Sequence, residues 1–129
     1  MTNTPENALN SLLSNNSAVT AAAPGGVWTS RLPQEVTLPA ASIHLLSTKF
    51  DVAHDKSVGD EGTYQISCWG DTSADVVTLG NAVVAALQSF KGTVDGLEID
   101  RIEVINLDEM PPVNENDFHR VVTVQVYYQ

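Results

Sequence analysis

Three histidines and one cysteine are the side chains in this 129-residue chain that most readily suggest a metal site or a nucleophile. A structural or catalytic metal site needs two to four ligands that converge at about 2 Å, commonly with helical or hairpin spacing. His44 and His119 fall in separate strand-like stretches and His54 in a polar one, so their spacing fits neither pattern. Cys68 would need a base beside it to attack a substrate. Its alternation with Tyr64 predicts a small core residue instead.

Carboxylates are frequent, but they form no recognisable catalytic pattern. The segment "DVAHDKSVGDEG" at 51–62 could surround a hard cation, yet it lacks the alternating ligands and fixed glycine of a calcium loop. "DGLEID" at 95–100 offers acids on a predicted turn and strand, whereas acid–base catalysis needs a pair that faces one pocket. "PGG" at 24–26 lacks the strand and helix context of a phosphate-binding loop. We therefore expect no enzyme, no cofactor and no metal.

The charge balance excludes several classes of partner. Sixteen Asp and Glu face six Lys and Arg, which gives a net charge of −10. Such a chain is a poor ligand for a nucleic-acid backbone or an anionic membrane, both of which attract clustered basic residues. A lone cysteine allows no internal disulfide, and the N-terminus lacks the basic and apolar regions of a signal peptide. We expect a single domain over residues 1–129.

Hydrophobic periodicity indicates the elements that position these residues. Thr4 followed by Pro5 predicts a helix start, and "SNNS" at 14–17 ends or bends that helix. The expected order is α-β-β-β-α-β-β, which predicts an α+β fold: a mainly antiparallel sheet with two helices packed on one face. After the first helix, the expected elements are a short strand at 27–33, strands at 38–50 and 63–70, a helix at 71–92, and strands at 95–109 and 117–129.

The helix at 71–92 and the strand that follows it give the sharpest packing expectations. The helix has cap-type residues at its start, Asp75 in its first turn and small residues along its apolar stripe, so it should lie close against a sheet. In the strand at 95–109, alternation places Ile102 and Val104 on one face and Ile99 on the other.

The stretch "DFHRVVTVQVYYQ" at 117–129 is rich in β-branched and aromatic residues and is apolar on both faces for most of its length. No turn signal follows it, and after its first residues nothing blocks pairing along its edge. We expect neighbouring copies of the chain to cover this edge and the second apolar face. The candidate subunit interface comprises Arg120, Val122, Val124, Val126, Tyr127 and Tyr128.

The polar segment at 51–62 is longer than a tight hairpin turn and is held between two strands. Such a loop can move without unfolding a sheet, so we expect it to contact a partner or to line a channel. Its candidate residues are Asp51, His54, Asp55, Lys56, Asp60 and Glu61.

In combination, these features resemble the tail terminator, or tail completion, proteins of long-tailed bacteriophages, over about residues 6–129. "LNSLLSNNSAVTAAAPGGVWTSRLPQEVTLPAASIHLLST" resembles the family's helix, turn, short strand and extended run. "GTYQISCWGDTSADVVTLGNAVVAALQSF" resembles its most typical block, an alternating strand that leads into a small-residue helix. "NDFHRVVTVQVYY" resembles its final strand.

The resemblance implies a virion protein of the tail or neck that is assembled in the host cytoplasm and has no enzymatic activity. Copies would form a ring, usually hexameric, at the head-facing end of the tail tube. The ring would stop tube polymerisation and contact the tail tube protein and the head's connector or stopper protein. DNA would pass through its centre without specific binding.

Two other interpretations remain open from the residues alone. One is a related phage component, either another neck or connector protein or a tube subunit. The other is a small dimeric ligand-binding or regulatory α+β domain, with a pocket lined by polar groups. The candidate lining residues are His44, Gln65, Ser67 and Trp69.

Overall fold

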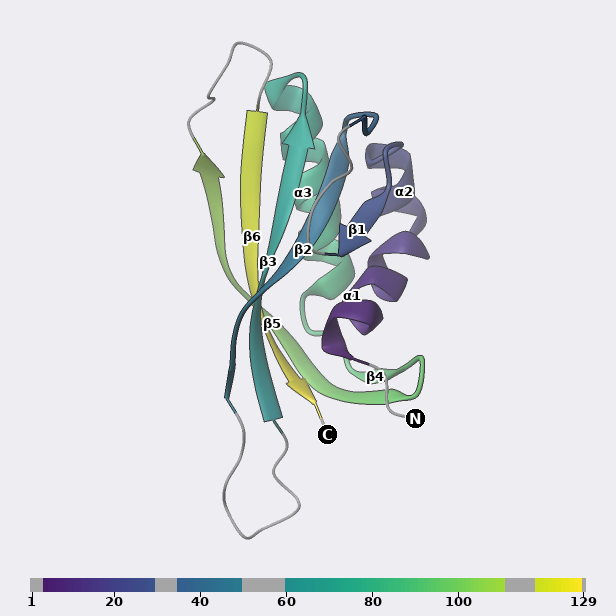
Figure 1. Ribbon diagram of the computed structural model, residues 1–129, viewed down its shortest axis with the longest axis vertical. Helices are drawn as coiled ribbons and strands as arrows, with labels where there is room; N and C mark the ends of the chain where they lie inside the picture. The colour runs from purple at the N-terminus through teal and green to yellow at the C-terminus, as the bar shows by residue number, and fades with distance from the viewer. Residues whose placement is uncertain (1–3, 30–34, 50–59, 111–117, 129) are drawn as a thin grey trace, which may run out of the picture.

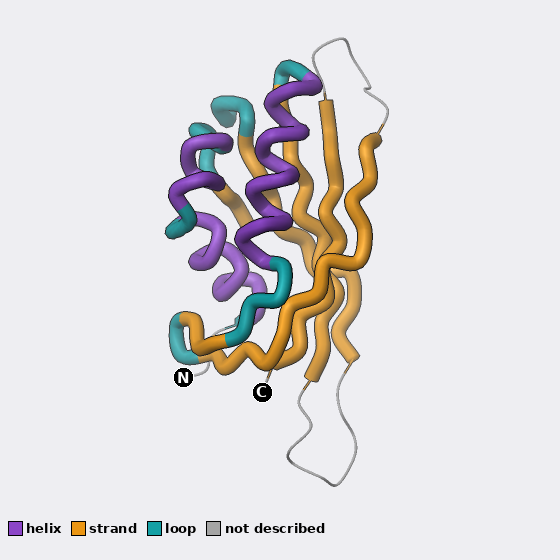
Figure 2. The backbone as a smooth tube through the Cα atoms, turned by 180° about the vertical axis from the view of Figure 1, so that it is seen from behind, coloured by secondary structure: helices purple, strands orange, loops and turns teal. Residues whose placement is uncertain are grey.

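A computed structural model describes residues 4–29, 35–49, 60–110 and 118–128. A strongly twisted sheet carries all the described helices on one face and leaves the other face without helices (Figures 1 and 2). The helices are α1 (Pro5–Ser14), α2 (Ser17–Ala22) and α3 (Ser73–Leu87). The strands are β1 (Val27–Thr29), β2 (Ala40–Lys49), β3 (Asp60–Gly70), β4 (Gly92–Val94), β5 (Leu97–Met110) and β6 (Phe118–Tyr128).

The six described strands form one sheet in the order β1-β2-β3-β6-β5-β4. Only the short β1–β2 pair is parallel, and every other pair is antiparallel. This confirms the predicted α+β class with a mainly antiparallel sheet. The described residues add a third helix, α2, and a short strand, β4, to the expected elements.

Side-chain caps set the starts of the helices. The Thr4 hydroxyl accepts a hydrogen bond from the backbone N–H of Asn7, with Pro5 in the first turn. The Asn16 side chain accepts hydrogen bonds from the N–H groups of Ala18 and Val19, so it starts α2 directly after α1 has ended. This confirms that "SNNS" ends the first helix.

Helix α3 covers the centre of the sheet and lies close to it, as the small-residue stripe predicted. Leu79, Val83 and Leu87 are fully buried. A Cβ added to Gly80 would lie 3.2 Å from Cδ of Arg120 on β6. Because that distance is tighter than an ordinary van der Waals contact, glycine permits the close approach of helix and strand.

The expectation that the C-terminal strand is an open edge is wrong. Strand β6 is paired along its full length with β3 on one side and with most of β5 on the other. Val122, Val124 and Val126 are fully buried in the core beneath the helices of the same copy. These three residues of the candidate interface therefore serve the protomer's own packing.

A bulge also changes the faces expected for β5. The pairing with β6 passes from Ile99 directly to Arg101, so Asp100 is an inserted residue that breaks the simple alternation. Ile99 is buried in the same core as Ile102, on the helix side of the sheet. The prediction that Ile99 and Ile102 lie on opposite faces is therefore wrong.

Truncation of a core leucine on α3 should test this packing. Replacing Leu79 by Ala should lower the free energy of unfolding by about 2–5 kcal/mol, because the buried side chain leaves a cavity. The matched control Thr78→Ala, which changes an exposed residue of the same helix, should stay within about 0.5 kcal/mol. Urea unfolding of dilute protein measures both. An equal, small effect in the two variants would contradict the assigned core.

Candidate assembly surface

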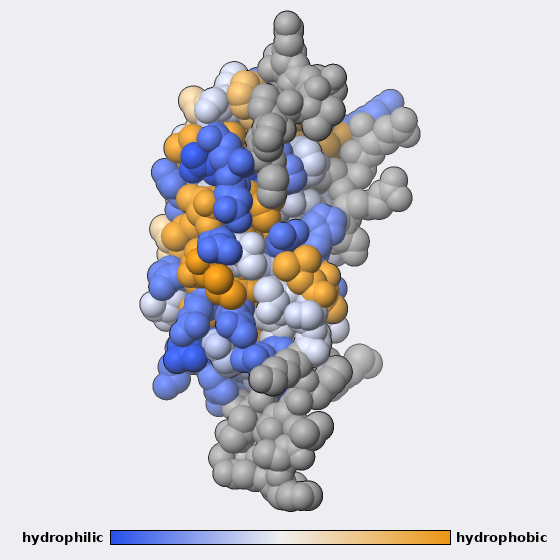
Figure 3. All heavy atoms as spheres, turned by 90° about the vertical axis from the view of Figure 1, so that its left-hand side faces the viewer, coloured by the Kyte–Doolittle hydropathy of each residue, from blue (hydrophilic) through white to orange (hydrophobic). Residues whose placement is uncertain are grey.

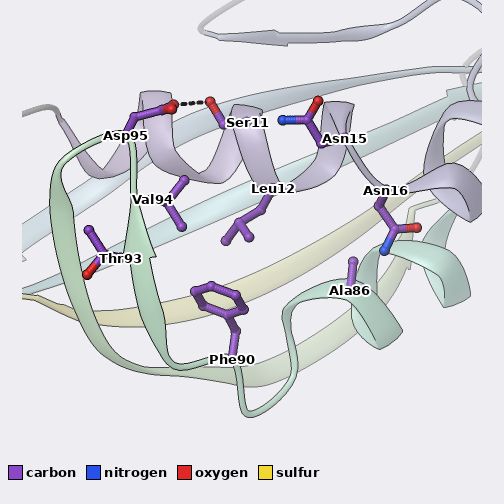
Figure 4. Close-up of a pocket in the computed structure, with 9 residues that line it drawn as sticks. All are labelled: Ser11, Leu12, Asn15, Asn16, Ala86, Phe90, Thr93, Val94 and Asp95. Atoms are coloured by element: carbon purple, nitrogen blue, oxygen red, sulfur yellow. Dashed lines mark hydrogen bonds between the residues drawn. The ribbon is translucent and has the colours of Figure 1, made fainter.

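A groove lies where α1 and the start of α2 meet the end of α3 and β4 (Figure 4). Its volume is about 510 Å³, with an apolar floor that includes Leu12, Phe90 and Val94. At its rim, the Ser11 hydroxyl donates a hydrogen bond to the Asp95 carboxylate. Asp95 is the one ionisable side chain among the described lining residues. With an apolar floor and one carboxylate that is hydrogen-bonded at its rim, the groove has the composition of a packing seam.

Cys68 also lacks the surroundings of a nucleophile. The side chain is fully buried on the helix side of β3, and burial raises the pKa of its thiol to about 12. A thiol of this kind stays protonated at neutral pH and has no access to a substrate. This confirms the prediction of a small core residue. Within the described ranges, no three His, Cys, Asp or Glu side chains gather in a way that could hold a metal ion.

The face of the sheet opposite the helices, called here the open face, has a polar centre. Cross-strand pairing aligns His44 of β2 with Gln65 of β3 and Thr123 of β6. Two residues away along the strands, Ser42 pairs with Ser67, and both of these side chains are buried. In the opposite direction, Thr63 pairs with Gln125, and both are half-buried. Figure 3 views this face and shows polar and apolar residues mixed across it. Its central rows therefore offer hydroxyl and amide groups without a formal charge.

One end of the open face carries an aromatic pair. The rings of Trp69 and His119 stack with centroids 3.7 Å apart and planes 9° from parallel. Within the described part of the chain, Trp69 Nε1 and His119 Nε2 are buried and have no hydrogen-bond partner. Burial, with a smaller contribution from the nearby His44, lowers the pKa of His119 below its ordinary value of 6.5. The imidazole therefore stays neutral while it covers the indole.

The ligand-binding interpretation depended on four of these residues. His44, Gln65, Ser67 and Trp69 do lie on one face of the sheet, spread over two adjacent strands. Ser67 is buried and the other three are half-buried along the sheet, whereas a small-molecule site needs a concave pocket that buries most of its ligand. Their arrangement fits a broad contact surface better than a regulatory ligand site.

At each of the two edges of the sheet, part of a long strand is unpaired within the described ranges. On β2, β1 covers only residues 41–43, which leaves 44–49 open. On β5, β4 covers residues 97–99. The backbone N–H of Ile102 donates to the Phe90 carbonyl, and the Ile102 carbonyl accepts from the N–H of Ser89. The N–H of Val104 donates to the Gln88 side chain at 3.0 Å. Residues 105–110 are left open.

The unpaired segments carry most of the exposed large apolar side chains. Leu45 and Leu46 on β2 are 46% and 52% exposed, and Ile105 and Leu107 on β5 are 47% and 41% exposed. The one other large apolar residue that is exposed in the described structure, Trp28, lies on β1 next to the β2 edge. Open apolar edges are normally blocked or covered in monomers, so these two segments are the strongest candidates for contact with another chain.

The remaining candidate residues fall in different places. Asp51, His54, Asp55 and Lys56 lie outside the described residues. Asp60 and Glu61 begin β3 and pair with Tyr128 and Tyr127, so the loop expected over 51–62 does not include them.

Three residues of the candidate interface keep part of their surface exposed in the protomer, namely Arg120, Tyr127 and Tyr128. The Arg101 guanidinium lies 4.5 Å from the ring centroid of Tyr127. Arg120 lies 3.8 Å from the Glu109 carboxylate. Sequence reasoning missed the exposed residues of the β2 and β5 edges, because their exposure depends on the strand order.

Comparisons with known proteins agree with this architecture. A family model described as tail completion protein gp17 matches residues 7–129, nearly the whole chain. The chain belongs to this family. Tail completion proteins are structural components of the tails of phage-like virions, so the chain is a virion tail protein and not an enzyme.

A solved structure shows the same fold. One chain of a structure described as the virion of a native gene transfer agent particle superimposes with a TM-score of 0.73 at 14% sequence identity. The match covers 96% of this chain and 93% of that one. The comparison with curated protein sequences finds no match. None of the helices in the described ranges is long and apolar enough to cross a membrane.

The Trp69–His119 pair predicts a pH dependence of stability. Because the folded-state pKa of His119 lies below 6.5, the unfolded chain binds a proton at a pH where the folded protein does not. The stability contributed by the neutral imidazole is therefore full above pH 6.5 and is lost as the pH falls through 6.5 towards the folded-state pKa.

Urea unfolding at pH 7.0, 6.5, 6.0 and 5.5 measures this dependence. The variant His119→Gln should show a flatter dependence than the tail completion protein with its native sequence, whereas the control Thr78→Ala should keep the native slope. An unchanged slope in His119→Gln would show that other groups cause the loss.

Proposed function

We propose that copies of this tail completion protein form a hexameric ring at the head-proximal end of the tail tube. The ring ends tube polymerisation and joins the tail to the head connector. The observation that carries the proposal is the family match over residues 7–129. The direct partners would be sister subunits, the tail tube protein and the connector or stopper protein of the head.

The distribution of apolar surface supports self-assembly. The two open edges lie at opposite sides of one sheet, on β2 and on β5. A contact between different surfaces of identical copies leaves each copy with one free surface of each kind, so it propagates until the assembly closes. Two complementary edges on one protomer are therefore suited to a ring.

The charge of the protein supports passage of DNA without adhesion. Each copy carries a net charge of −10, and several copies around a channel would repel phosphate groups. The central rows of the open face add hydroxyl and amide groups that carry no positive charge. A channel lined by such groups would offer DNA no cluster of basic side chains to bind.

A tube subunit is the closest alternative, and assembly behaviour separates the two. Purified protein should remain monomeric or stop at one ring, and should halt growth of its cognate tube when added to polymerising tube protein. Light scattering gives the mass of the assembly, and electron microscopy gives tube lengths with and without the protein. Long stacks formed by this protein alone would favour a tube subunit instead.

We also propose that the segment between β2 and β3 contacts the tube or the channel, with Asp51, His54, Asp55 and Lys56 as its candidate residues and Asp60 and Glu61 at its base in β3. Deleting residues 53–59 should leave a soluble, folded protein, because this deletion keeps β3 intact and the segment joins adjacent antiparallel strands. The same deletion should impair tail termination or head joining, measured as the yield of infectious particles. A normal yield from the deletion would exclude this role.

A further inference from the structure

The proposed ring leaves open which surfaces of adjacent subunits meet, and four exposed side chains point to an answer. Leu45 and Leu46, called here the β2 ridge, are exposed on the unpaired part of β2 at one edge of the sheet. Ile105 and Leu107, called here the β5 ridge, are exposed on the unpaired part of β5 at the opposite edge. We propose that the β2 ridge of one copy packs against the β5 ridge of the next copy, an inference that rests on the proposed ring.

Each ridge contains the inserted residue of a β-bulge. The pairing of β2 with β3 skips Leu46, and the pairing of β5 with β6 skips Ile105. A bulge interrupts the regular ladder and redirects a side chain. The contact is therefore made by apolar side chains around the two bulges, and it need not extend along the whole length of either strand.

The two ridges lie at the same level of the sheet. One cross-strand row runs from Leu45 through Tyr64 and Val124 to Val104. Leu46 follows Leu45 in the sequence and Ile105 follows Val104, so a bulge residue lies next to each end of this row. Joining ridges at one level moves the next copy sideways with little shift along the strands. A rotation without such a shift closes into a ring, whereas a shift would give a helical filament.

Strand direction also fits this pairing. Three successive antiparallel pairings separate β2 from β5, so the two strands run in opposite directions and meet as antiparallel neighbours between copies.

Cysteine cross-linking distinguishes this contact from other arrangements. The variants Leu46→Cys and Ile105→Cys are purified separately, mixed and assembled on tail tubes. The thiols are then oxidised. Cys68 stays in place because it is buried. The mixture should give covalent dimers, whereas each variant alone should give none. The double variant should give a ladder of bands that stops at the ring size. Thr78→Cys mixed with Ala85→Cys, at exposed positions on α3, is the matched control and should give no dimers.

The possible failures of this experiment have separate meanings. Dimers from Leu46→Cys alone would overturn the inference in favour of a two-fold contact between β2 edges. Rings of the expected mass without cross-links between positions 46 and 105 would also overturn it, while leaving the proposed function intact. Failure of the native protein to form rings on the tube, or to limit tube length, would refute the proposed function itself.

A charge placed in the β2 ridge provides a second readout. Leu46→Glu should weaken ring assembly by roughly tenfold or more, because the interface would have to bury a carboxylate. Leu46→Met should assemble nearly as well as the native protein. Circular dichroism should show both variants folded, since Leu46 is 52% exposed in the protomer. Undiminished assembly of Leu46→Glu would contradict the assigned contact.

Discussion

The position of β6 between β3 and β5 is the constraint on which the rest of the structure depends. This strand joins the β2–β3 hairpin to the β4–β5 hairpin, and without it the described strands would fall into two separate sheets. Its helix-side residues Val122, Val124 and Val126 fill the centre of the core. The wide sheet that results is what α3 covers and what sets the distance between the open edges. Pairing on both sides of one strand thus determines the core and the outline of the protomer together.

The sheet divides its surfaces among different tasks. The helix side buries the apolar residues that stabilise the protomer. The open face presents hydroxyl and amide groups in its central rows, and the edges hold most of the exposed large apolar side chains. This division is consistent with the proposed assembly of copies into a ring on the tail tube.

Local patterns in the sequence predicted the local elements well. The cap-type residues before Asp75 and the small-residue stripe predicted α3 and its close packing, and both depend on neighbours within a few turns. The central position of β6 could not be predicted in this way, because strand order depends on pairing between distant segments. The face of Ile99 was missed because one inserted residue, Asp100, reverses the alternation. The exposed residues of the β2 and β5 ridges were missed because their exposure depends on the strand order.

The order of synthesis gives the central strand a further importance. Strand β6 follows both of its partners in the chain, so the ribosome releases β3 and β5 before the strand that must lie between them. A nascent or prematurely terminated chain therefore cannot hold its two hairpins at their final separation. A chain that terminates before β6 would therefore lack the fixed spacing between its two sheet edges.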